Sequence, residues 1–155
     1  MRVPGVGGPR QVLGAALAAL EAAGLELESA SPVIATAPLG PSLRRYANAA
    51  AVVASDRDPP AVLALLQHIE RAFGRKQRGQ RWRARPLDLD IVLWSGGARA
   101  GEGLVIPHPR FRTRGFVLEP AAAIAPRWRD PVTALTLAHL RARRRRRLDR
   151  RRSAP

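Results

Sequence analysis

The chain has 155 residues, no cysteine, and 27 Lys and Arg against 12 Asp and Glu, which gives a net charge of +15. This length suits a single domain, the lack of cysteine excludes disulfides and thiolate metal sites, and no apolar run reaches the roughly 18 residues of a membrane span. We therefore expect a cytoplasmic protein whose excess of positive charge favours polyanionic ligands.

The first part of the chain predicts a helix followed by extended segments. Leucine and alanine recur at helical spacing over residues 12–23, and Gly24 marks the end of this helix. Residues 25–37 and 46–55 contain β-type residues and are predicted to be extended.

A second helix is predicted after Asp58, a typical cap residue, with Pro59 in the first turn. Its buried face is an apolar stripe formed by Val62, Leu65, Leu66, Ile69 and Phe73. Further along we expect a short strand at residues 104–106, a helical turn at 112–118 and a last helix at 132–140. This order predicts an α+β sandwich in which helices pack on one face of a mainly antiparallel sheet.

No linker is long enough to divide the chain, so residues 1–140 form one predicted domain. Residues 141–155 form an arginine-rich tail, with nine arginines and one aspartate between Arg141 and Arg152. Because like charges repel one another, we expect this tail to be disordered or only partly helical. Its affinity for nucleic acid is expected to be incidental, since no aromatic residues alternate with its cations.

Residues 87–94 combine an apolar alternation with two acids. As a strand, this segment would send its leucines to a core, and Asp88 and Asp90 to the opposite face. Two neighbouring carboxylates repel unless a cation lies between them, and Mg²⁺ combines a few carboxylate oxygens with waters and phosphates. The segment is thus a candidate magnesium site, and solvated strand acids are the alternative.

A basic stretch precedes these acids. Residues 71–85 include two glycines and Trp82 beside seven cations, which are Arg71, Arg75, Lys76, Arg78, Arg81, Arg83 and Arg85. We predict a mobile basic loop, and cations beside a metal site suit a polyphosphate ligand. A solvated loop with general affinity for nucleic acid is an equal alternative on composition alone.

His108 lies between two prolines, which favours a constrained turn over a helix or central strand. Arg110, Arg112 and Arg114 follow it. An imidazole among arginines tends to stay neutral and can hydrogen-bond a phosphate or a hydroxyl. An ordinary surface histidine is the alternative.

Taken in chain order, these motifs resemble 6-hydroxymethyl-7,8-dihydropterin pyrophosphokinase, a folate-pathway family that moves a pyrophosphoryl group from ATP to a pterin alcohol. The resemblance runs from Val12 to Ala138. Its most specific segments are residues 85–91, 107–111 and 114–118, and residues 36–40, 46–50 and 69–75 support it. It implies a ferredoxin-like fold, ATP as co-substrate and two Mg²⁺ ions. We expect a monomer that acts on ATP and 6-hydroxymethyl-7,8-dihydropterin.

The resemblance also implies roles for single residues. Asp88 and Asp90 would hold the two Mg²⁺ ions, and Arg75 and Arg85 would share the catalytic work. The ATP-binding residues would be Glu70, Arg75, Trp82, Arg85, His108 and Arg114. The pterin-binding residues would be Pro38, Leu39, Gly40, Asn48 and Phe116.

Three of these residues have plain structural alternatives. Asn48 could end a strand, Phe116 could belong to the core, and Glu70 could pair with Arg71 or Arg75 on its own helix or just beyond it. Their order relative to the acidic segment is what favours the functional interpretation.

The beginning of the chain departs from the family. The family opens with a hydrophobic strand that runs into a Gly-Ser-Asn turn, whereas residues 1–8 contain Pro4 and Gly5 and no such turn. The first strand is therefore expected to be missing or degenerate. We expect either a start downstream of the true one or a damaged, unstable copy.

Two other functions stay open. A basic nucleic-acid-binding protein would explain the arginines but not the paired acids or the Pro-His turn. A different Mg²⁺-dependent phosphotransferase or nucleotidyltransferase would use the same acids on another acceptor. The nucleotide product separates the last case, because pyrophosphoryl transfer leaves AMP and ordinary kinase chemistry leaves ADP.

Overall fold

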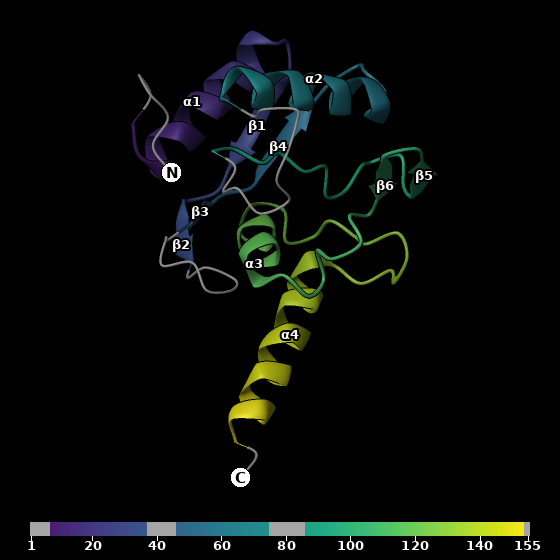
Figure 1. The fold of residues 1–155 in the computed structure, drawn as a ribbon. Coiled ribbons are helices and arrows are strands. Elements are labelled where there is room, and N and C mark those ends of the chain that lie inside the picture. The colour runs from purple at the N-terminus through teal and green to yellow at the C-terminus, as the bar shows by residue number, and fades with distance from the viewer. Residues whose placement is uncertain (1–6, 37–45, 75–85, 154–155) are drawn as a thin grey trace.

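The computed structural model describes residues 7–36, 46–74 and 86–153, and Figure 1 shows their arrangement. In this part of the chain the elements follow the order α1 (Pro9–Ala22), β1 (Glu26–Ala30), β2 (Ile34–Thr36), β3 (Tyr46–Asn48), β4 (Ala51–Ala54), α2 (Pro59–Ala72), β5 (Arg99–Gly101), β6 (Leu104–Ile106), α3 (Gly115–Ile124) and α4 (Leu137–Arg152). The predicted α+β class is confirmed, and each described strand pair is antiparallel. The expected defect in the first strand falls largely on residues 1–6, outside the described residues.

The first half of the fold follows the local signals of the sequence. Gly24 follows α1 with a φ of +83°, a conformation that glycine adopts without strain. At the start of α2, the Asp58 carboxylate accepts a hydrogen bond from the Ala61 backbone N–H, as expected of a cap. The two predicted extended segments are each divided into short strands, and β1 pairs with β4 while β2 pairs with β3.

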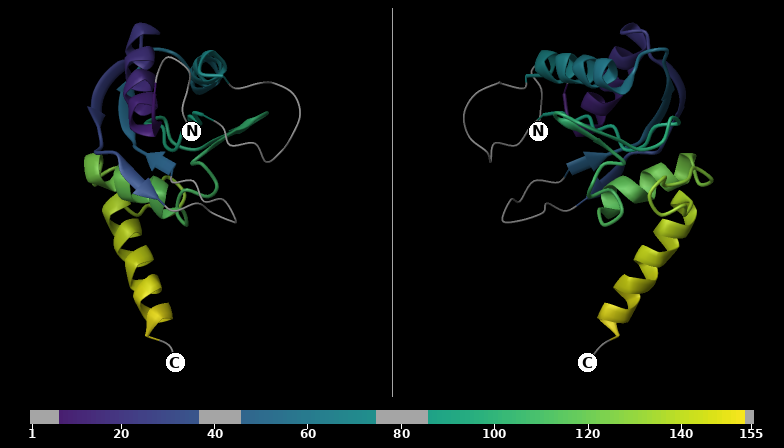
Figure 2. Two further views of the ribbon diagram at one scale, coloured as in Figure 1. Left: turned by 60° about the vertical axis from the view of Figure 1, so that its left-hand side comes forward. Right: turned by 90° about the vertical axis from the view of Figure 1, so that its right-hand side faces the viewer.

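Side chains of β4 alternate between two apolar clusters. Val53 packs against the cluster that α1 and α2 form with Leu25 and Leu87. Its neighbour Val52 packs against a second cluster, formed by Phe111, α3 and the start of α4. Helices therefore cover both sides of these strands (Figure 2), and the prediction of helices on one face was wrong. The reason is that β4 is apolar at every position, so both of its faces require cover.

Residues 87–94, predicted as a strand, join no ladder within the described part of the chain. Their backbone groups bond to other partners. The Leu89 N–H donates to the Glu70 carboxylate at 2.8 Å, and the Val92 carbonyl accepts from the His108 N–H at 3.0 Å. A side chain and a turn thus supply hydrogen bonds that a neighbouring strand was expected to supply.

The apolar pattern of this segment is confirmed only in its first part. Leu87, Leu89 and Ile91 pack against the first cluster, as the alternation predicts. Leu93 instead packs with Val92 against the second cluster. The segment therefore passes between the two clusters, and its two ends serve different cores.

The later helices are displaced from their predicted positions. α3 begins at Gly115 and continues to Ile124, beyond the single turn predicted at 112–118. α4 begins at Leu137 because the Thr136 hydroxyl caps it, accepting from the His139 N–H at 3.2 Å. Residues 131–133, where a helix was predicted to begin, form a turn whose Val132 and Thr133 bond to the Asp130 carboxylate.

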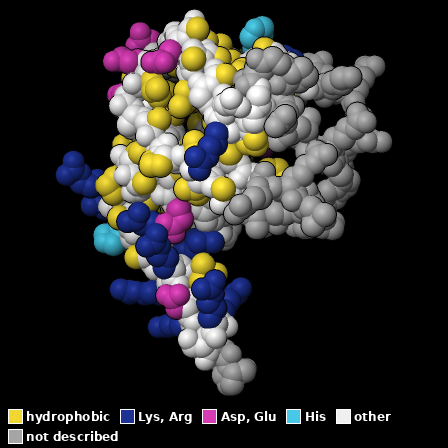
Figure 3. Space-filling model, turned by 90° about the vertical axis from the view of Figure 1, so that its left-hand side faces the viewer, with side chains coloured by type: hydrophobic (Ala, Val, Ile, Leu, Met, Phe, Trp, Pro, Cys, Tyr) yellow, Lys and Arg dark blue, Asp and Glu magenta, His cyan; other side chains and the backbone are white. Residues whose placement is uncertain are grey.

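The arginine-rich segment 141–152 continues α4 as a helix, whereas the sequence predicted a tail that is disordered or only partly helical. It continues a helix whose first turn is fixed by the buried residues Leu137 and Leu140. One turn later, the Arg145 guanidinium donates two hydrogen bonds to the Glu119 carboxylate on α3, at 2.6 and 3.1 Å. These contacts offset part of the repulsion among the cations, which Figure 3 shows gathered along α4.

Within residues 7–36, 46–74 and 86–153, no helix combines the length and the apolar character that crossing a membrane requires.

Candidate active site

Asp88 and Asp90 are exposed on a segment whose leucines point inward. Leu87 is 4% exposed and Leu89 is half-buried, so the alternation places both carboxylates at the surface. Among the described residues, no cluster of three or more acidic, histidine or cysteine side chains surrounds them. Two exposed carboxylates fit a hard cation such as Mg²⁺, which takes its other ligands from water and phosphate.

A buried acid lies directly beneath this segment. Glu70, on α2, is 2% exposed, and its Oε1 accepts the hydrogen bond from the Leu89 N–H. Leu89 stands between the two aspartates, so this bond joins α2 to the middle of the candidate metal-binding segment. The sequence placed Glu70 near the site, but no local pattern could predict a bond across 19 positions.

His108 lies on a turn next to the acidic segment. Its backbone N–H donates to the Val92 carbonyl, and its Nδ1 accepts from the Arg110 N–H at 3.2 Å. The predicted turn at this histidine is therefore confirmed. Because the turn is bonded to the segment that carries the aspartates, the two predicted motifs are held side by side.

A shallow pocket of about 330 Å³ lies between these two motifs and the β5–β6 hairpin. Asp90 and His108 both line it, together with Leu63, Gly101, Val105 and neighbouring residues. β5 was not predicted, although the glycines on either side of Glu102, at the end of β5 and just before β6, are a turn signal that could have indicated the hairpin. The pocket supplies a mixed, mainly apolar surface beside one candidate metal ligand.

Arg114 and Phe116 lie at the start of α3. The Arg114 guanidinium lies over the Phe116 ring, 5.7 Å from its centroid, which is within the range of cation–π attraction. Phe116 is half-buried, whereas Phe111 is the fully buried phenylalanine of the second cluster. The ring of Phe116 is therefore not simply a core residue.

Asn48 lies on β3, and β3 packs against α3, the helix of Phe116. Its side-chain N–H donates to the Thr36 hydroxyl on β2 at 2.8 Å. Asn48 is the last residue of β3, as the structural alternative expected, and its bond to Thr36 joins β3 to β2.

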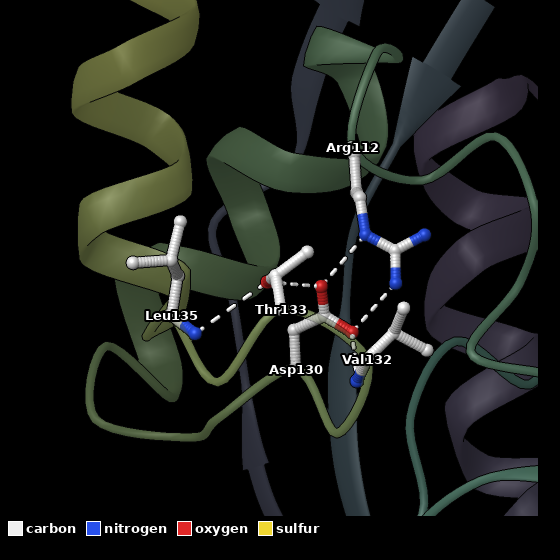
Figure 4. A network of polar contacts seen from close by, with 5 residues as sticks. All are labelled: Arg112, Asp130, Val132, Thr133 and Leu135. Atoms are coloured by element: carbon white, nitrogen blue, oxygen red, sulfur yellow. Dashed lines mark hydrogen bonds and ion pairs between the residues drawn. The ribbon is translucent and has the colours of Figure 1, made fainter.

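An ion pair between Arg112 and the buried Asp130 stabilises the turn that follows His108, and it was not predicted from the sequence. Figure 4 shows the Asp130 carboxylate accepting from Arg112 Nε at 2.7 Å and from Nη2 at 2.6 Å, and also from Val132 and Thr133. Burial works to raise the pKa of Asp130, but the bonds from Arg112, Thr133 and Val132 hold it below its ordinary value. Aspartate is common in turns because its side chain can accept from the backbone two positions later. This residue preference could have indicated the turn at Asp130.

Several predicted residues lie outside the described part of the chain. These are Arg75, Trp82 and Arg85 of the predicted loop, and Pro38, Leu39 and Gly40 of the predicted pterin pocket. The other predicted residues lie within the described part of the chain, and these are Glu70, Asp88, Asp90, His108, Arg114, Asn48 and Phe116.

The chain is similar to known proteins over most of its length. The family model of 7,8-dihydro-6-hydroxymethylpterin-pyrophosphokinase matches residues 5–126. A relative from Synechocystis sp., named 2-amino-4-hydroxy-6-hydroxymethyldihydropteridine pyrophosphokinase, is 37% identical over 118 residues, which cover 76% of this chain and 60% of the relative.

Two further relatives carry the same name. That of Pseudomonas aeruginosa is 38% identical over 125 residues, covering 79% of this chain and 76% of the relative. That of Haemophilus influenzae is 38% identical over 119 residues, covering 76% and 74%. On this match the chain belongs to the 7,8-dihydro-6-hydroxymethylpterin-pyrophosphokinase family.

Proposed function

We propose that this chain transfers pyrophosphate from ATP to 6-hydroxymethyl-7,8-dihydropterin in a Mg²⁺-dependent reaction that yields the pterin diphosphate and AMP. The observation that carries the proposal is the exposure of Asp88 and Asp90 beside a pocket that Asp90 shares with His108. The proposal includes a cytoplasmic monomer, as expected from the sequence.

The acidic segment and the turn divide the work of holding ATP. Asp88 and Asp90 would hold two Mg²⁺ ions, which would neutralise phosphate charge when bound. His108 and Arg114 would contact the phosphates and the nucleotide, and Glu70 would support this region from below. Arg75, Arg85 and Trp82 are proposed to complete the phosphate site.

The pterin is proposed to bind to Asn48 of β3 and Phe116 of α3. The Asn48 amide can pair with the edge of a heterocycle, and the half-buried Phe116 ring can stack on its face. Pro38, Leu39 and Gly40 would contribute backbone groups. In this position the hydroxymethyl oxygen attacks the β-phosphorus of ATP while the bond to the AMP oxygen breaks, so positioning and charge neutralisation do most of the catalytic work.

The test is to incubate the full chain with ATP, Mg²⁺ and 6-hydroxymethyl-7,8-dihydropterin and to measure AMP by chromatography. We expect AMP to form only when the pterin is present. Pterin-dependent ADP would instead indicate an ordinary kinase acting on the same acceptor, and the absence of any nucleotide product would contradict the proposal.

A variant links the reaction to the acidic segment. Asp90→Ala should lower the rate by at least about 100-fold, because removing a group that stabilises transition-state charge commonly costs 10² to 10³ in rate. Asp56→Ala, at an exposed aspartate on the turn before α2, is the matched control and should keep the wild-type rate. Full activity of Asp90→Ala, with an unchanged circular dichroism spectrum, would refute the assignment of Asp90.

A further inference from the structure

The acidic segment, residues 87–94, is held by a hydrogen bond to a buried side chain. Residues 87–94 join no ladder in the described chain, so neighbouring strands do not fix their backbone there. The bond from the Leu89 N–H to Glu70 Oε1 is short, at 2.8 Å, and its acceptor side chain is 2% exposed. A buried carboxylate is costly unless it accepts hydrogen bonds, which indicates that this contact is a specific feature of the site.

The position of this bond matters more than its strength. The Leu89 N–H belongs to the peptide group that joins Asp88 to Leu89, so the bond constrains the backbone directly beside Asp88 and one residue before Asp90. Leu87 and Leu89 anchor the inward side of the segment in the first cluster. The apolar contacts set the depth of the segment, and a directional hydrogen bond is needed to set its orientation.

We propose that Glu70 is a positioning residue, which acts by holding the Asp88–Leu89 peptide group so that the carboxylates of Asp88 and Asp90 are aligned for Mg²⁺ and the ATP phosphates. This inference rests on the proposed function of the acidic segment. Glu70 would act through the backbone of Leu89, because the buried Glu70 Oε1 accepts the hydrogen bond from the Leu89 N–H.

Two substitutions distinguish positioning through Leu89 from a direct interaction of the Glu70 charge with the nucleotide. Glu70→Gln keeps a carbonyl oxygen that can accept from Leu89 but removes the charge. Glu70→Met keeps the length of the side chain and removes the oxygen acceptor. Glu21→Met, at an exposed glutamate on α1, controls for the substitution itself.

Two readouts are needed. The first is hydrogen exchange of the Leu89 amide, which requires no activity. We expect exchange to be at least about tenfold faster in Glu70→Met than in the wild type, as follows from loss of a hydrogen bond to a charged group, and close to wild type in Glu70→Gln and Glu21→Met. The second is the Mg²⁺ concentration for half-maximal AMP formation, which should rise at least about tenfold in Glu70→Met with little change in the KM for the pterin.

The possible outcomes have distinct meanings. Unchanged Leu89 exchange in Glu70→Met, or a Glu70→Gln variant as impaired in Mg²⁺ dependence as Glu70→Met, would overturn the positioning role. If Glu70→Met does not fold, the Glu70→Gln comparison still decides between acceptor and charge. A wild-type chain that forms no AMP would refute the proposed function, while Leu89 exchange would still report whether Glu70 holds this peptide.

Discussion

At the scale of single residues, Asp130 connects two regions that are distant in the sequence. It lies in the connection between α3 and α4 and is 0% exposed, and its partner Arg112 belongs to the segment that follows His108. Because the pKa of Asp130 is held below its ordinary value of 3.8, the carboxylate stays ionised at neutral pH and the pair stays intact. The ion pair of Asp130 with Arg112 therefore stabilises the turn that carries His108.

This pair predicts a pH dependence of stability. A carboxyl group with a depressed pKa in the folded state contributes its stabilisation above the unfolded-state value near 3.8 and loses it as the pH falls through the folded-state value. Asp130→Asn should therefore lower the free energy of unfolding by about 3 kcal/mol at pH 7, the low end for a broken buried pair because Arg112 is 27% exposed.

Thermal unfolding from pH 7 down to pH 2.5 would check this prediction. The difference between wild type and Asp130→Asn should shrink below about pH 4. An equal difference at pH 3 and pH 7 would show that the effect of the substitution does not depend on the charge of Asp130.

The candidate site shows which residues a sequence can identify. Asp88, Asp90 and His108 were found because an alternation and a pair of flanking prolines are visible within a few positions. The bonds of Glu70 to Leu89 and of Arg112 to Asp130 span 19 and 18 positions, and they exist only once the fold has brought those positions together. The sequence could therefore indicate candidate residues, but not the contacts that support them.

At the scale of elements, the same distinction separates helices from strands. α1 and α2 were predicted well because helical periodicity and caps are local signals. The segment 87–94 was predicted as a strand from its apolar alternation. Strand formation also depends on partners, which the residues of the segment itself do not reveal. α4 was not predicted beyond Leu140. Its anchor is the contact of Arg145 with Glu119 on α3, and these two residues are 26 positions apart in the sequence.

The anchor of α4 leads to a second prediction. Hydrogen bonds and charge from Arg145 hold the pKa of Glu119 below its ordinary value although burial opposes this, so the pair is ionised at neutral pH. Arg145 is 60% exposed, and we therefore expect Glu119→Gln to lower the free energy of unfolding by less than about 1 kcal/mol. Repulsion among the remaining cations should nevertheless fray the end of α4.

Amide exchange measures this local effect directly. Residues 146–152 should exchange faster in Glu119→Gln than in wild type, and the difference should diminish in high salt. Glu102→Gln, between β5 and β6, is an exposed control of equal charge change. Unchanged exchange over residues 146–152 would show that the Arg145–Glu119 contact does not hold the helix.

At the scale of the whole molecule, the two apolar clusters and the charged surface have separate roles. The acidic segment runs between the clusters, so packing on both sides supports the candidate site. α4 extends away from this body (Figure 1), and the apolar residues of its first turns, Leu137 and Leu140, are buried against it. The rest of α4 presents mostly arginine to solvent.

The exposed cations of α4 predict a salt-dependent affinity for nucleic acid that is separate from catalysis. Arg143, Arg146, Arg147 and Arg150 share one face of the helix. If each neutralises one phosphate of a random duplex, the logarithm of the binding constant should fall with the logarithm of salt concentration with a slope of roughly −3 to −4 from this face. Replacing all four with Gln should remove that part of the slope and leave pterin-dependent AMP formation unchanged.

The control must change the net charge equally elsewhere. Replacing the exposed residues Arg10, Arg57, Arg99 and Arg127 with Gln alters the same number of charges on other elements. If α4 provides a local binding face, the control variant should keep most of the wild-type slope, because phosphate contacts act within about 10 Å at ordinary ionic strength. If both variants weaken binding equally, the affinity comes from the net charge of the whole molecule, and α4 is a solvated helix without a nucleic-acid partner of its own.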